Sequence, residues 1–243
     1  MAKLLENSYR SMNIAFIAEW ALLAERTGVD LFAVVDSIRV REGTHDNMRY
    51  PGFGVGGYCI TKDSMLAQWG ADQLLGANVV LEMTLNAVKS NFFMPLHALD
   101  LLAEALGDVA GKKIAVCGIS YLPGVADSRN SPMEQFYEAL VEGGATVRVH
   151  DAQVRTWAAR PEIELTQSFD AAVEAADAVV LAVADPLYLD LAAAELHAAV
   201  GRPTVLVDAN NVVADEKAAE LVAHGWRVTG VGKGHWRRRR FHV

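Results

Sequence analysis

Five short apolar runs in the second half of the chain constrain its fold more than any other feature. The first covers residues 113–117, and the others cover 147–150, 178–183, 204–208 and 227–231. Stretches with helical character lie between them, among them residues 133–142 and 214–223. Strands that alternate with helices in this way form a parallel sheet with helices on both faces. The sequence therefore predicts an α/β fold, with a doubly wound, Rossmann-like parallel sheet over residues 108–243.

Residues 1–107 have a different periodicity. Apolar side chains recur every three or four residues over 3–27 and again over about 81–106, which predicts two long amphipathic helices. Gly28 fits the end of the first helix, and Pro95 can kink the second. This part of the chain is predicted to be a helical domain.

Shorter elements complete both parts. Asp30 is expected to cap a helix over residues 31–40, residues 41–51 are polar and expected to form a loop, and a short helix is expected over 64–70. The sequence Ser-Pro-Met-Glu at 131–134 has the form of a capping box with proline at the first helical position.

A glycine-rich loop with one cysteine covers residues 50–63, Y-P-G-F-G-V-G-G-Y-C-I-T-K-D. Glycines let the backbone approach a ligand closely. The cation of Lys62, together with a helix expected after Asp63, would stabilise a thiolate at Cys59. In this interpretation the loop places a reactive cysteine next to a bound ligand. The alternative is a plain glycine turn with a buried cysteine and Asp63 as a helix cap, and the spacing alone does not separate the two.

Composition narrows the classes of partner and site. A net charge of −8 over 243 residues argues against nucleic acid or an anionic membrane as the main partner. No apolar run reaches the ~18 residues typical of a membrane span, and the N-terminus lacks a signal-peptide pattern. Two cysteines are too few for a disulfide framework and favour a reducing compartment, the cytoplasm.

Three further features have plain structural interpretations. Cys117 lies in the first predicted strand and is expected to be buried. The seven histidines show no metal-ligand spacing, so no metal site is predicted. The basic stretch 236–240 is expected to be a mobile, solvated end.

The sequence G-V-G-G-Y-C-I-T-K-D resembles the catalytic loop of the UDP-glucose/GDP-mannose dehydrogenase family, the nucleotide-sugar 6-dehydrogenases. Three further stretches agree with the family in the same order: K-L-L-E-N-S-Y-R-S-M-N-I-A at 3–15, R-E-G-T-H at 41–45 and D-S-R-N-S-P at 127–132. The resemblance covers almost the whole chain, but only the central and C-terminal parts of the family's architecture. It implies that residues 1–107 make a homodimer and that residues 108–243 bind the UDP part of a sugar nucleotide.

The resemblance also implies a reaction. In the family, the C6 alcohol of the sugar is oxidised twice with two NAD⁺, through a cysteine thiohemiacetal and then a thioester, which water releases as the uronic acid. Cys59 matches the nucleophile, and Asp63 matches the aspartate that positions water. Lys3 matches the lysine that stabilises the developing oxyanion, and Asn7 matches the asparagine beside it. Lys3 and Asn7 are four residues apart and share a helix face.

Binding roles follow from the same resemblance. Lys62 and Arg129 match cationic positions that face the NAD dinucleotide. Arg41 matches an arginine that reaches the nucleotide of the neighbouring subunit. The positions where the family's loop wraps the UDP-sugar are Tyr50, Gly52 and Gly56.

The chain departs from the family's pattern in three places. It begins where the family's central helix begins, so the N-terminal NAD-binding domain is expected to be missing. The second half has no G-x-G-x-x-G after its first strand either. Leu122 follows Tyr121 where the family usually carries a Lys or Arg that contacts the diphosphate. Asn210 stands at the arginine of the family's D-G-R turn.

Two hypotheses follow. The first is a NAD-dependent 6-dehydrogenase of a UDP-hexose, either UDP-glucose or a UDP-N-acetylhexosamine, with GDP-mannose as a less favoured substrate. The alternative is a truncated, catalytically inactive module for dimerisation and UDP-sugar binding. The chain alone is expected not to reduce NAD⁺, because it offers only one flank of a dinucleotide site. It is expected to form a homodimer and to have a more reactive thiol at Cys59 than at Cys117.

Overall fold

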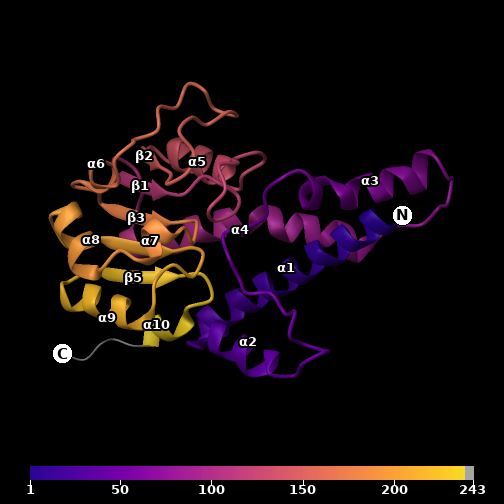
Figure 1. Cartoon of the computed structure of the whole chain (residues 1–243), viewed down its shortest axis with the longest axis horizontal. Coiled ribbons are helices and arrows are strands. Elements are labelled where there is room, and N and C mark those ends of the chain that lie inside the picture. The colour runs from indigo at the N-terminus through magenta and orange to yellow at the C-terminus, as the bar shows by residue number, and fades with distance from the viewer. Residues whose placement is uncertain (239–243) are drawn as a thin grey trace.

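The helical and the alternating parts of the sequence form two regions that meet along one long helix (Figure 1). The computed structural model describes residues 1–238. The helices of the first region are α1 (Ala2–Thr27), α2 (Leu31–Arg39), α3 (Cys59–Gln73) and α4 (Glu82–Leu106). The N-terminal part of α1, α3 and the beginning of α4 form an arm that projects away from the sheet, with the N-terminus at its far end (Figure 1).

The ends of the first helices follow their sequence signals. Gly28 ends α1 in the left-handed conformation, with φ of 72°, which glycine adopts without steric cost. The Asp30 side chain accepts a hydrogen bond from the Phe32 N–H at 3.0 Å and so caps α2. Pro95 lies inside α4. The predictions for both long helices and for these two caps are confirmed.

The second region is a five-stranded sheet in which every pair of neighbours is parallel. The strand order is β2-β1-β3-β4-β5. The strands are β1 (Lys113–Cys117), β2 (Thr146–His150), β3 (Ala178–Leu181), β4 (Val205–Asp208) and β5 (Arg227–Gly230). The chain winds outward from β1 to β2 and then returns past β1 to β3, so the predicted doubly wound α/β fold is confirmed.

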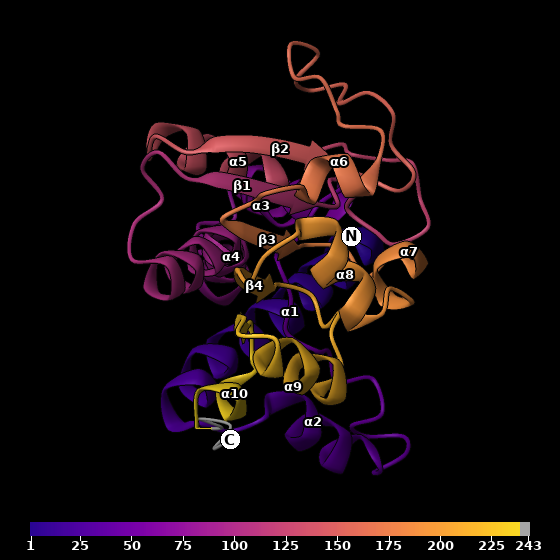
Figure 2. The same cartoon turned by 90° about the vertical axis from the view of Figure 1, so that its left-hand side faces the viewer.

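The strands are apolar on both sides because helices cover both faces (Figure 2). One face packs against α4 and α5, and its side chains are Ile114, Val116, Ala178, Val180, Val205 and Val207. The other packs against the helices that follow β2, β3 and β4, and its side chains are Ala115, Cys117, Val179, Leu181 and Leu206. Cys117 is fully buried, as predicted.

Short helices follow each of the five strands, and the last of them comes after β5. They are α5 (Met133–Glu142), α6 (Phe169–Val173), α7 (Pro186–Leu189), α8 (Ala193–Val200), α9 (Asp215–Ala223) and α10 (Gly234–Arg238). At the start of α5, the Ser131 hydroxyl accepts a hydrogen bond from the Met133 N–H at 3.1 Å. The predicted capping box needs the Glu134 N–H to donate to that hydroxyl and the Ser131 N–H to donate to the Glu134 side chain. Within the described residues neither bond is formed: the Glu134 N–H donates to the Ser131 carbonyl at 3.2 Å and Pro132 is the N-cap, so the prediction of a capping box is wrong, although the helix does begin there.

The prediction of a solvated basic end is wrong for its first residues. Trp236 lies in α10, is buried in the cluster on the far face of the sheet, and donates its indole N–H to Asp215 at 2.8 Å. Arg237 is paired with Glu104 of α4 at 2.6 Å. The remaining arginines of the stretch, Arg239 and Arg240, lie outside the described residues. A buried tryptophan thus anchors a segment whose charge alone suggested solvation.

The two regions share one buried core rather than two separate ones. Ile17 and Leu31 of the helical region belong to the same apolar cluster as Val116 and Val207 of the sheet. A buried carboxylate joins them as well: Glu25 of α1 accepts a hydrogen bond from the Gly232 N–H at 2.8 Å and contacts His97 of α4 at 2.8 Å. Over residues 1–238, no helix combines the length and the apolar character needed to cross a membrane.

Candidate active site

The cysteine of the glycine loop lies at the start of a helix. α3 begins at Cys59 itself, so the prediction that a short helix starts after Asp63 is wrong, and Asp63 is not a helix cap. Tyr58 precedes the helix and offers no capping side chain, so no residue marks the start of the helix in the sequence. The free thiol of Cys59 is half-buried in the first turn of a 15-residue helix, where the helix dipole favours a thiolate.

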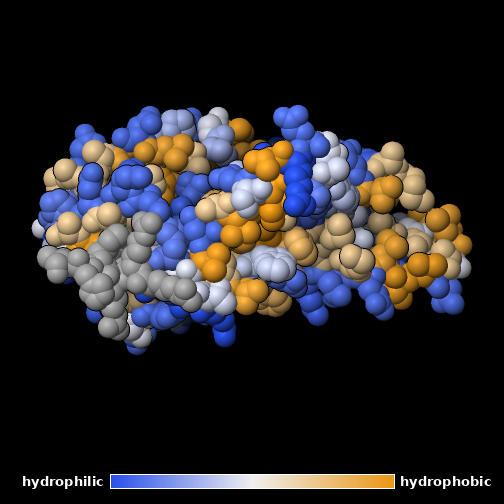
Figure 3. All heavy atoms as spheres, turned by 90° about the horizontal axis from the view of Figure 1, so that it is seen from below, coloured by the Kyte–Doolittle hydropathy of each residue, from blue (hydrophilic) through white to orange (hydrophobic). Residues whose placement is uncertain are grey.

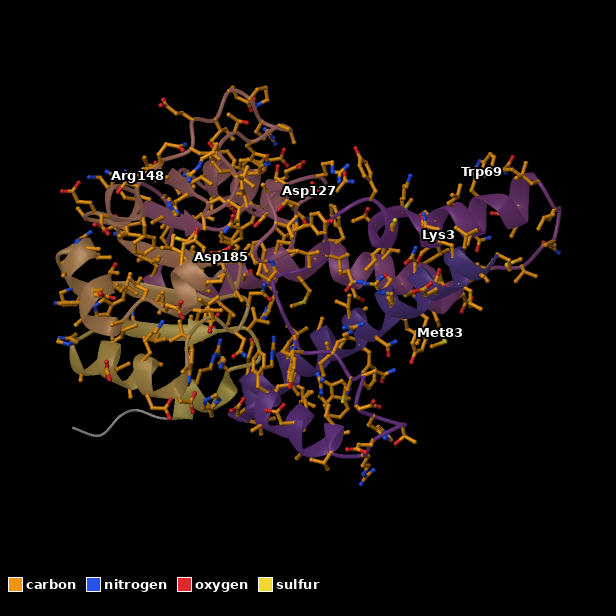
Figure 4. The ribbon with its side chains drawn as sticks, viewed as in Figure 1. Lys3, Trp69, Met83, Asp127, Arg148 and Asp185 are labelled. Carbon is orange, nitrogen blue, oxygen red and sulfur yellow. The ribbon has the colours of Figure 1, made fainter. Side chains whose placement is uncertain are left out.

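A polar cluster joins α1 to α3 one helical turn after Cys59. Asp63 is buried, and its carboxylate accepts a hydrogen bond from the Asn7 amide at 2.7 Å. The Lys3 ammonium is 3.8 Å from the same oxygen, and its side chain is 70% exposed. The Ser64 hydroxyl donates to the Ser8 hydroxyl at 3.2 Å beside them. Three residues that were predicted to act together, Lys3, Asn7 and Asp63, therefore form one cluster. Figure 4 shows Lys3 on the arm.

Cys59 and Asp63 are four residues apart in α3, so both side chains lie on one face of that helix. The arrangement brings together a thiol at a helix N-terminus, a buried carboxylate, an amide and an ammonium. Such a set can add sulfur to a carbonyl carbon, stabilise the oxyanion that forms and orient a water molecule.

The glycines before Cys59 allow protein, as well as ligand, to approach. A side chain at Gly56 would have its Cβ 2.4 Å from the Cβ of Tyr121, and one at Gly57, where φ is +79°, would contact the Tyr121 ring. The Gly57 N–H donates to the Arg129 carbonyl at 2.9 Å. The loop after β1 thus packs closely on the segment that leads into α3, and this packing leaves no room for a side chain at Gly56.

Two cations flank the ring of Tyr58. The Lys62 ammonium lies 5.7 Å from the ring centroid and the Arg129 guanidinium carbon lies 4.9 Å from it. The Arg129 side chain also forms a bidentate ion pair with Asp127, and this pairing holds the pKa of the Asp127 carboxyl below its usual range. The structure therefore brings Lys62 and Arg129 to one surface, as predicted for residues that face the same ligand.

A cavity of about 610 Å³ lies beside this surface, between α4 and α5. Tyr58, Lys62 and Asn91 line it together with Glu134, and burial raises the pKa of the Glu134 carboxyl. We call it the α4–α5 cavity.

A second cavity, of about 480 Å³, lies at the carboxyl ends of β1, β3 and β4. In doubly wound sheets this edge, where the chain reverses direction around β1, is where nucleotides bind. We call it the sheet-edge cavity. Its lining includes the predicted substrate residues Tyr50 and Gly52 and both departures from the family's pattern, Leu122 and Asn210. Gly52 packs so closely that an added Cβ would lie 2.5 Å from the Asn210 side-chain oxygen.

The strand ends do not fit the pyrophosphate of a dinucleotide. In dinucleotide-binding sheets, backbone N–H groups after the first strand hold the phosphates. Here the carboxylate of buried Asp151 accepts the Ile119 N–H at 2.6 Å and the Ser120 N–H at 2.9 Å. A carboxylate in the phosphate position excludes an anion from it.

Sequence reasoning missed two residues of the sheet-edge cavity and one cluster of possible metal ligands. Arg49 and Phe32 line the sheet-edge cavity, although neither lies in a recognised motif. The predicted site residue Arg41, in contrast, is exposed after α2 and lines neither cavity. Asp30, Asp215 and His235 place potential metal-ligand atoms within 4.8 Å of one another, which no spacing in the sequence indicated because they come from three separate segments.

Comparison with known proteins assigns the chain to a family. The model of the central domain of the UDP-glucose/GDP-mannose dehydrogenase family matches residues 1–91, and the model of the UDP binding domain of that family matches residues 115–215. The chain belongs to the UDP-glucose/GDP-mannose dehydrogenase family. The resemblance that rests on the glycine loop and on residues 3–15, 41–45 and 127–132 is therefore confirmed.

Relatives in this family are dehydrogenases of UDP-sugars. The UDP-N-acetyl-D-mannosamine dehydrogenase of Pyrococcus horikoshii is 31% identical over 96% of this chain and 51% of its own length. The UDP-glucose 6-dehydrogenase of Pseudomonas aeruginosa is 31% identical over 96% of this chain and 52% of its own length. The chain thus spans about half the length of the relatives it matches.

Solved structures of the family have the same fold. The NDP-N-acetyl-D-galactosaminuronic acid dehydrogenase of Methanosarcina mazei superposes with a TM-score of 0.89 and 28% identity, over 97% of this chain and 51% of its own. The UDP-D-ManNAc dehydrogenase of Pyrococcus horikoshii superposes with a TM-score of 0.82 and 30% identity, over 97% and 52%. The arrangement of the arm against the sheet is thus that of experimentally determined family members.

Proposed function

We propose that this chain carries the cysteine chemistry and the UDP-sugar site of a NAD-dependent nucleotide-sugar 6-dehydrogenase. Its substrate is a UDP-hexose, UDP-glucose or a UDP-N-acetylhexosamine, and its product is the uronic acid. The observation that carries the proposal is the cluster of Lys3, Asn7 and Asp63 one helical turn after Cys59. The family match and the UDP-sugars in the names of the relatives support the substrate class.

In this proposal Cys59 is the nucleophile. Its thiolate adds to the carbon of a C6 aldehyde, which forms a C–S bond and leaves negative charge on the aldehyde oxygen. Lys3 and Asn7 stabilise that oxygen, since an ammonium and an amide N–H both favour an anion. Oxidation of the adduct gives a thioester. Asp63 orients a water molecule whose oxygen attacks the thioester carbon, the C–S bond breaks, and Cys59 leaves as the thiolate.

NAD⁺, when bound, accepts the hydride in each of the two oxidations. Lys62 and Arg129 would hold the dinucleotide from one side. Because Asp151 occupies the backbone N–H groups at the end of β1, we expect no reduction of NAD⁺ by this chain alone. Growth of absorbance at 340 nm with purified chain, UDP-glucose and NAD⁺ would contradict that expectation.

A test of the cysteine chemistry can avoid the need for NAD⁺. A UDP-hexose whose C6 is an aldehyde should form a reversible thiohemiacetal with Cys59 and protect it from iodoacetamide, as read by peptide mass spectrometry. UDP-glucose, whose C6 is an alcohol, should protect Cys59 less at equal occupancy. Asp63→Asn should retain the adduct, and Lys3→Gln should weaken it. Equal protection by the aldehyde and the alcohol would overturn the role of Cys59.

We also propose that the chain is a homodimer through its arm. Large apolar side chains of α1, α3 and α4 are exposed there, and hydrophobic surface gathers over the arm (Figure 3). Leu5, Trp69 and Met83 are 69%, 51% and 70% exposed. Exposed apolar surface of this kind is typical of a protein interface.

The second candidate function is a binding module without catalysis. Its support is the match of residues 115–215 to a UDP binding domain. A chain that dimerises and binds UDP-sugars, but whose Cys59 is not protected by the aldehyde, would favour this function. For either function we propose a cytoplasmic location, since both cysteines are free, as in a reducing compartment.

A further inference from the structure

We propose that Arg49 binds the diphosphate of the nucleotide sugar in the sheet-edge cavity. This inference rests on the proposed function for the identity of the ligand, but its anion-binding part can be tested separately. Arg49 belongs to no recognised motif and was not predicted as a site residue.

The charge of the cavity favours an anionic ligand next to Arg49. Among the described residues that line the cavity, Arg49 is the only one with a positive charge, and none is acidic. Leu122 and Asn210, which stand at positions expected to be cationic, line the same cavity and bring no charge. A guanidinium offers paired N–H donors in a plane, which fits two phosphate oxygens. The cation of this site is thus supplied by the residue directly before the glycine loop and not by the sheet.

The backbone donors at the strand ends are largely used within the protein. Asp151 accepts the first two N–H groups after Gly118, and Asp208 accepts those of Val212 and Val213 at 2.9 Å each and that of Asn210 at 3.1 Å. These carboxylates occupy the donors with which a sheet edge commonly binds phosphate. A diphosphate in the cavity therefore needs a side-chain cation, and Arg49 is the one present.

Arg39 of α2 holds the two residues that flank Arg49, Met48 and Tyr50. The Arg39 guanidinium donates to the Met48 carbonyl at 3.0 Å, and its carbon lies 4.9 Å from the centroid of the Tyr50 ring. Tyr50 in turn donates its hydroxyl hydrogen to Asp36. The residues before and after Arg49 are therefore fixed on α2, which lowers the entropy lost when Arg49 binds a ligand.

An aromatic stack connects this anchor to the sheet. The Tyr50 ring stacks on Phe32 at 5.7 Å between centroids with 21° between planes. The ammonium of buried Lys233, which follows β5, lies 4.6 Å from the Phe32 ring. Phe32 and Tyr50 both line the cavity, so the stack forms part of its wall next to Arg49.

Calorimetric titration of the whole chain with three probes tests the proposal: UDP, uridine and inorganic pyrophosphate. Arg49→Gln should weaken UDP binding by roughly 10- to 100-fold, the value of one or two charge-assisted hydrogen bonds. It should leave uridine binding unchanged and abolish pyrophosphate binding. Arg49→Lys should restore part of the affinity for UDP. Arg155→Gln, a change at another exposed arginine, is the matched control and should bind all three probes like the wild type.

Each outcome decides between defined alternatives. UDP affinity unchanged in Arg49→Gln, or an equal loss for UDP and uridine, would overturn the role of Arg49. If the wild type binds pyrophosphate through Arg49 but does not bind UDP, the anion site stands and the proposed function fails. If the wild type binds neither probe, both fail. Circular dichroism of each variant ensures that a loss of affinity is not a loss of fold.

Discussion

The helical and the sheet regions differ in how many of their large apolar side chains are exposed. Among the described residues, the large apolar side chains that stay exposed in the sheet region are Leu122, Val125, Val141, Leu187 and Leu189. All the others belong to residues 1–106, and many lie on α1, α3 and α4. The sheet buries its own apolar surface between two layers of helices, whereas the arm leaves an apolar face uncovered.

The buried carboxylates differ in the same way. Asp208 of the sheet region accepts backbone N–H groups of its own loop, and Asp151 accepts those of its own loop and of the loop after β1, so both carboxylates shape loops. Asp63 of the arm accepts a side-chain amide from another helix and lies near an exposed lysine. The sheet region uses its buried charges for structure, and the arm keeps its charge available for chemistry. In the proposed function, the region that would meet a partner subunit is thus also the one that carries the reactive groups.

The largest expected difference between the regions is in thiol reactivity. With limiting iodoacetamide, Cys59 should react, and Cys117 should react at least about 1,000-fold more slowly, because a buried thiol is accessible to the reagent only in the rare molecules that have unfolded. Burial also raises the pKa of the Cys117 thiol, with a further contribution from the charge of Asp151. Peptide mass spectrometry across a pH series measures both rates. In urea the two rates should converge, and a native chain in which Cys117 is modified first would refute the difference.

The next largest effect concerns association. A Trp69→Glu, Met83→Glu double variant should raise the dimer dissociation constant by about 100-fold or more, because two charges would be buried in an apolar interface. Multi-angle light scattering over a dilution series measures this. Leu187→Glu, at an exposed leucine of the sheet region, should leave the dimer intact. A wild-type chain that is monomeric at micromolar concentration would show that the arm is covered by something other than a second copy.

A matched pair of substitutions separates the two kinds of buried carboxylate. Asp151→Asn should lower the free energy of unfolding by about 2–3 kcal/mol, because an amide presents an N–H₂ group to backbone donors. Asp63→Asn should change stability less and should instead slow hydrolysis of a Cys59 thioester. Urea denaturation measures the first effect, and release of a thioester formed from an acyl donor measures the second. If Asp63→Asn destabilised the chain as much as Asp151→Asn, Asp63 would be a structural residue too.

The smallest expected effect is a pH dependence that belongs to the sheet region. Burial lowers the pKa of His150 in the folded state, against an opposing effect of the Asp151 charge. The unfolded state therefore binds more protons than the folded state as the pH falls through the usual histidine pKa of about 6.5, and stability is lost toward acid. His150→Gln should flatten this loss in urea denaturation between pH 7.5 and 5.5. The exposed His45→Gln should keep the wild-type slope; a slope unchanged in His150→Gln would assign the loss to other groups.

Much of the fold follows from local signals in the sequence. The strands are short apolar runs and α1 ends at a glycine, so periodicity and turn residues are sufficient to place them. The start of α3 could not be placed in this way, because Tyr58 provides no cap and the helix is held by contacts of Asp63 and Ser64 with α1. The anchor of α10 was missed for a similar reason, since Trp236 gains its burial from a distant helix.

The residues of the candidate site that lie within one short motif could be predicted from the sequence. The contacts that join distant segments of the chain could not. The motif predicted Cys59 and Asp63 from their spacing. That Tyr121 lies on Gly56 depends on a contact between loops 65 residues apart in sequence. The position of Arg49 in the sheet-edge cavity depends on a stack that reaches from Arg39 to Lys233. No local pattern carries such information, because it arises only when the two regions pack.

The hydrogen bond between Glu25 and Gly232 spans 207 positions of the chain. During synthesis at about 5–20 residues per second, the carboxylate of the first helix waits roughly 10 to 40 s before its partner has been translated. Until then α1 lacks one of the contacts that hold it against the sheet, and a ribosome-bound chain exposes the apolar face that α1 later buries. Docking of the C-terminal end of α1 is therefore completed only after the segment that follows β5 has been made, and a chain whose translation stops before Gly232 leaves α1 without this contact and open to chaperones and proteases.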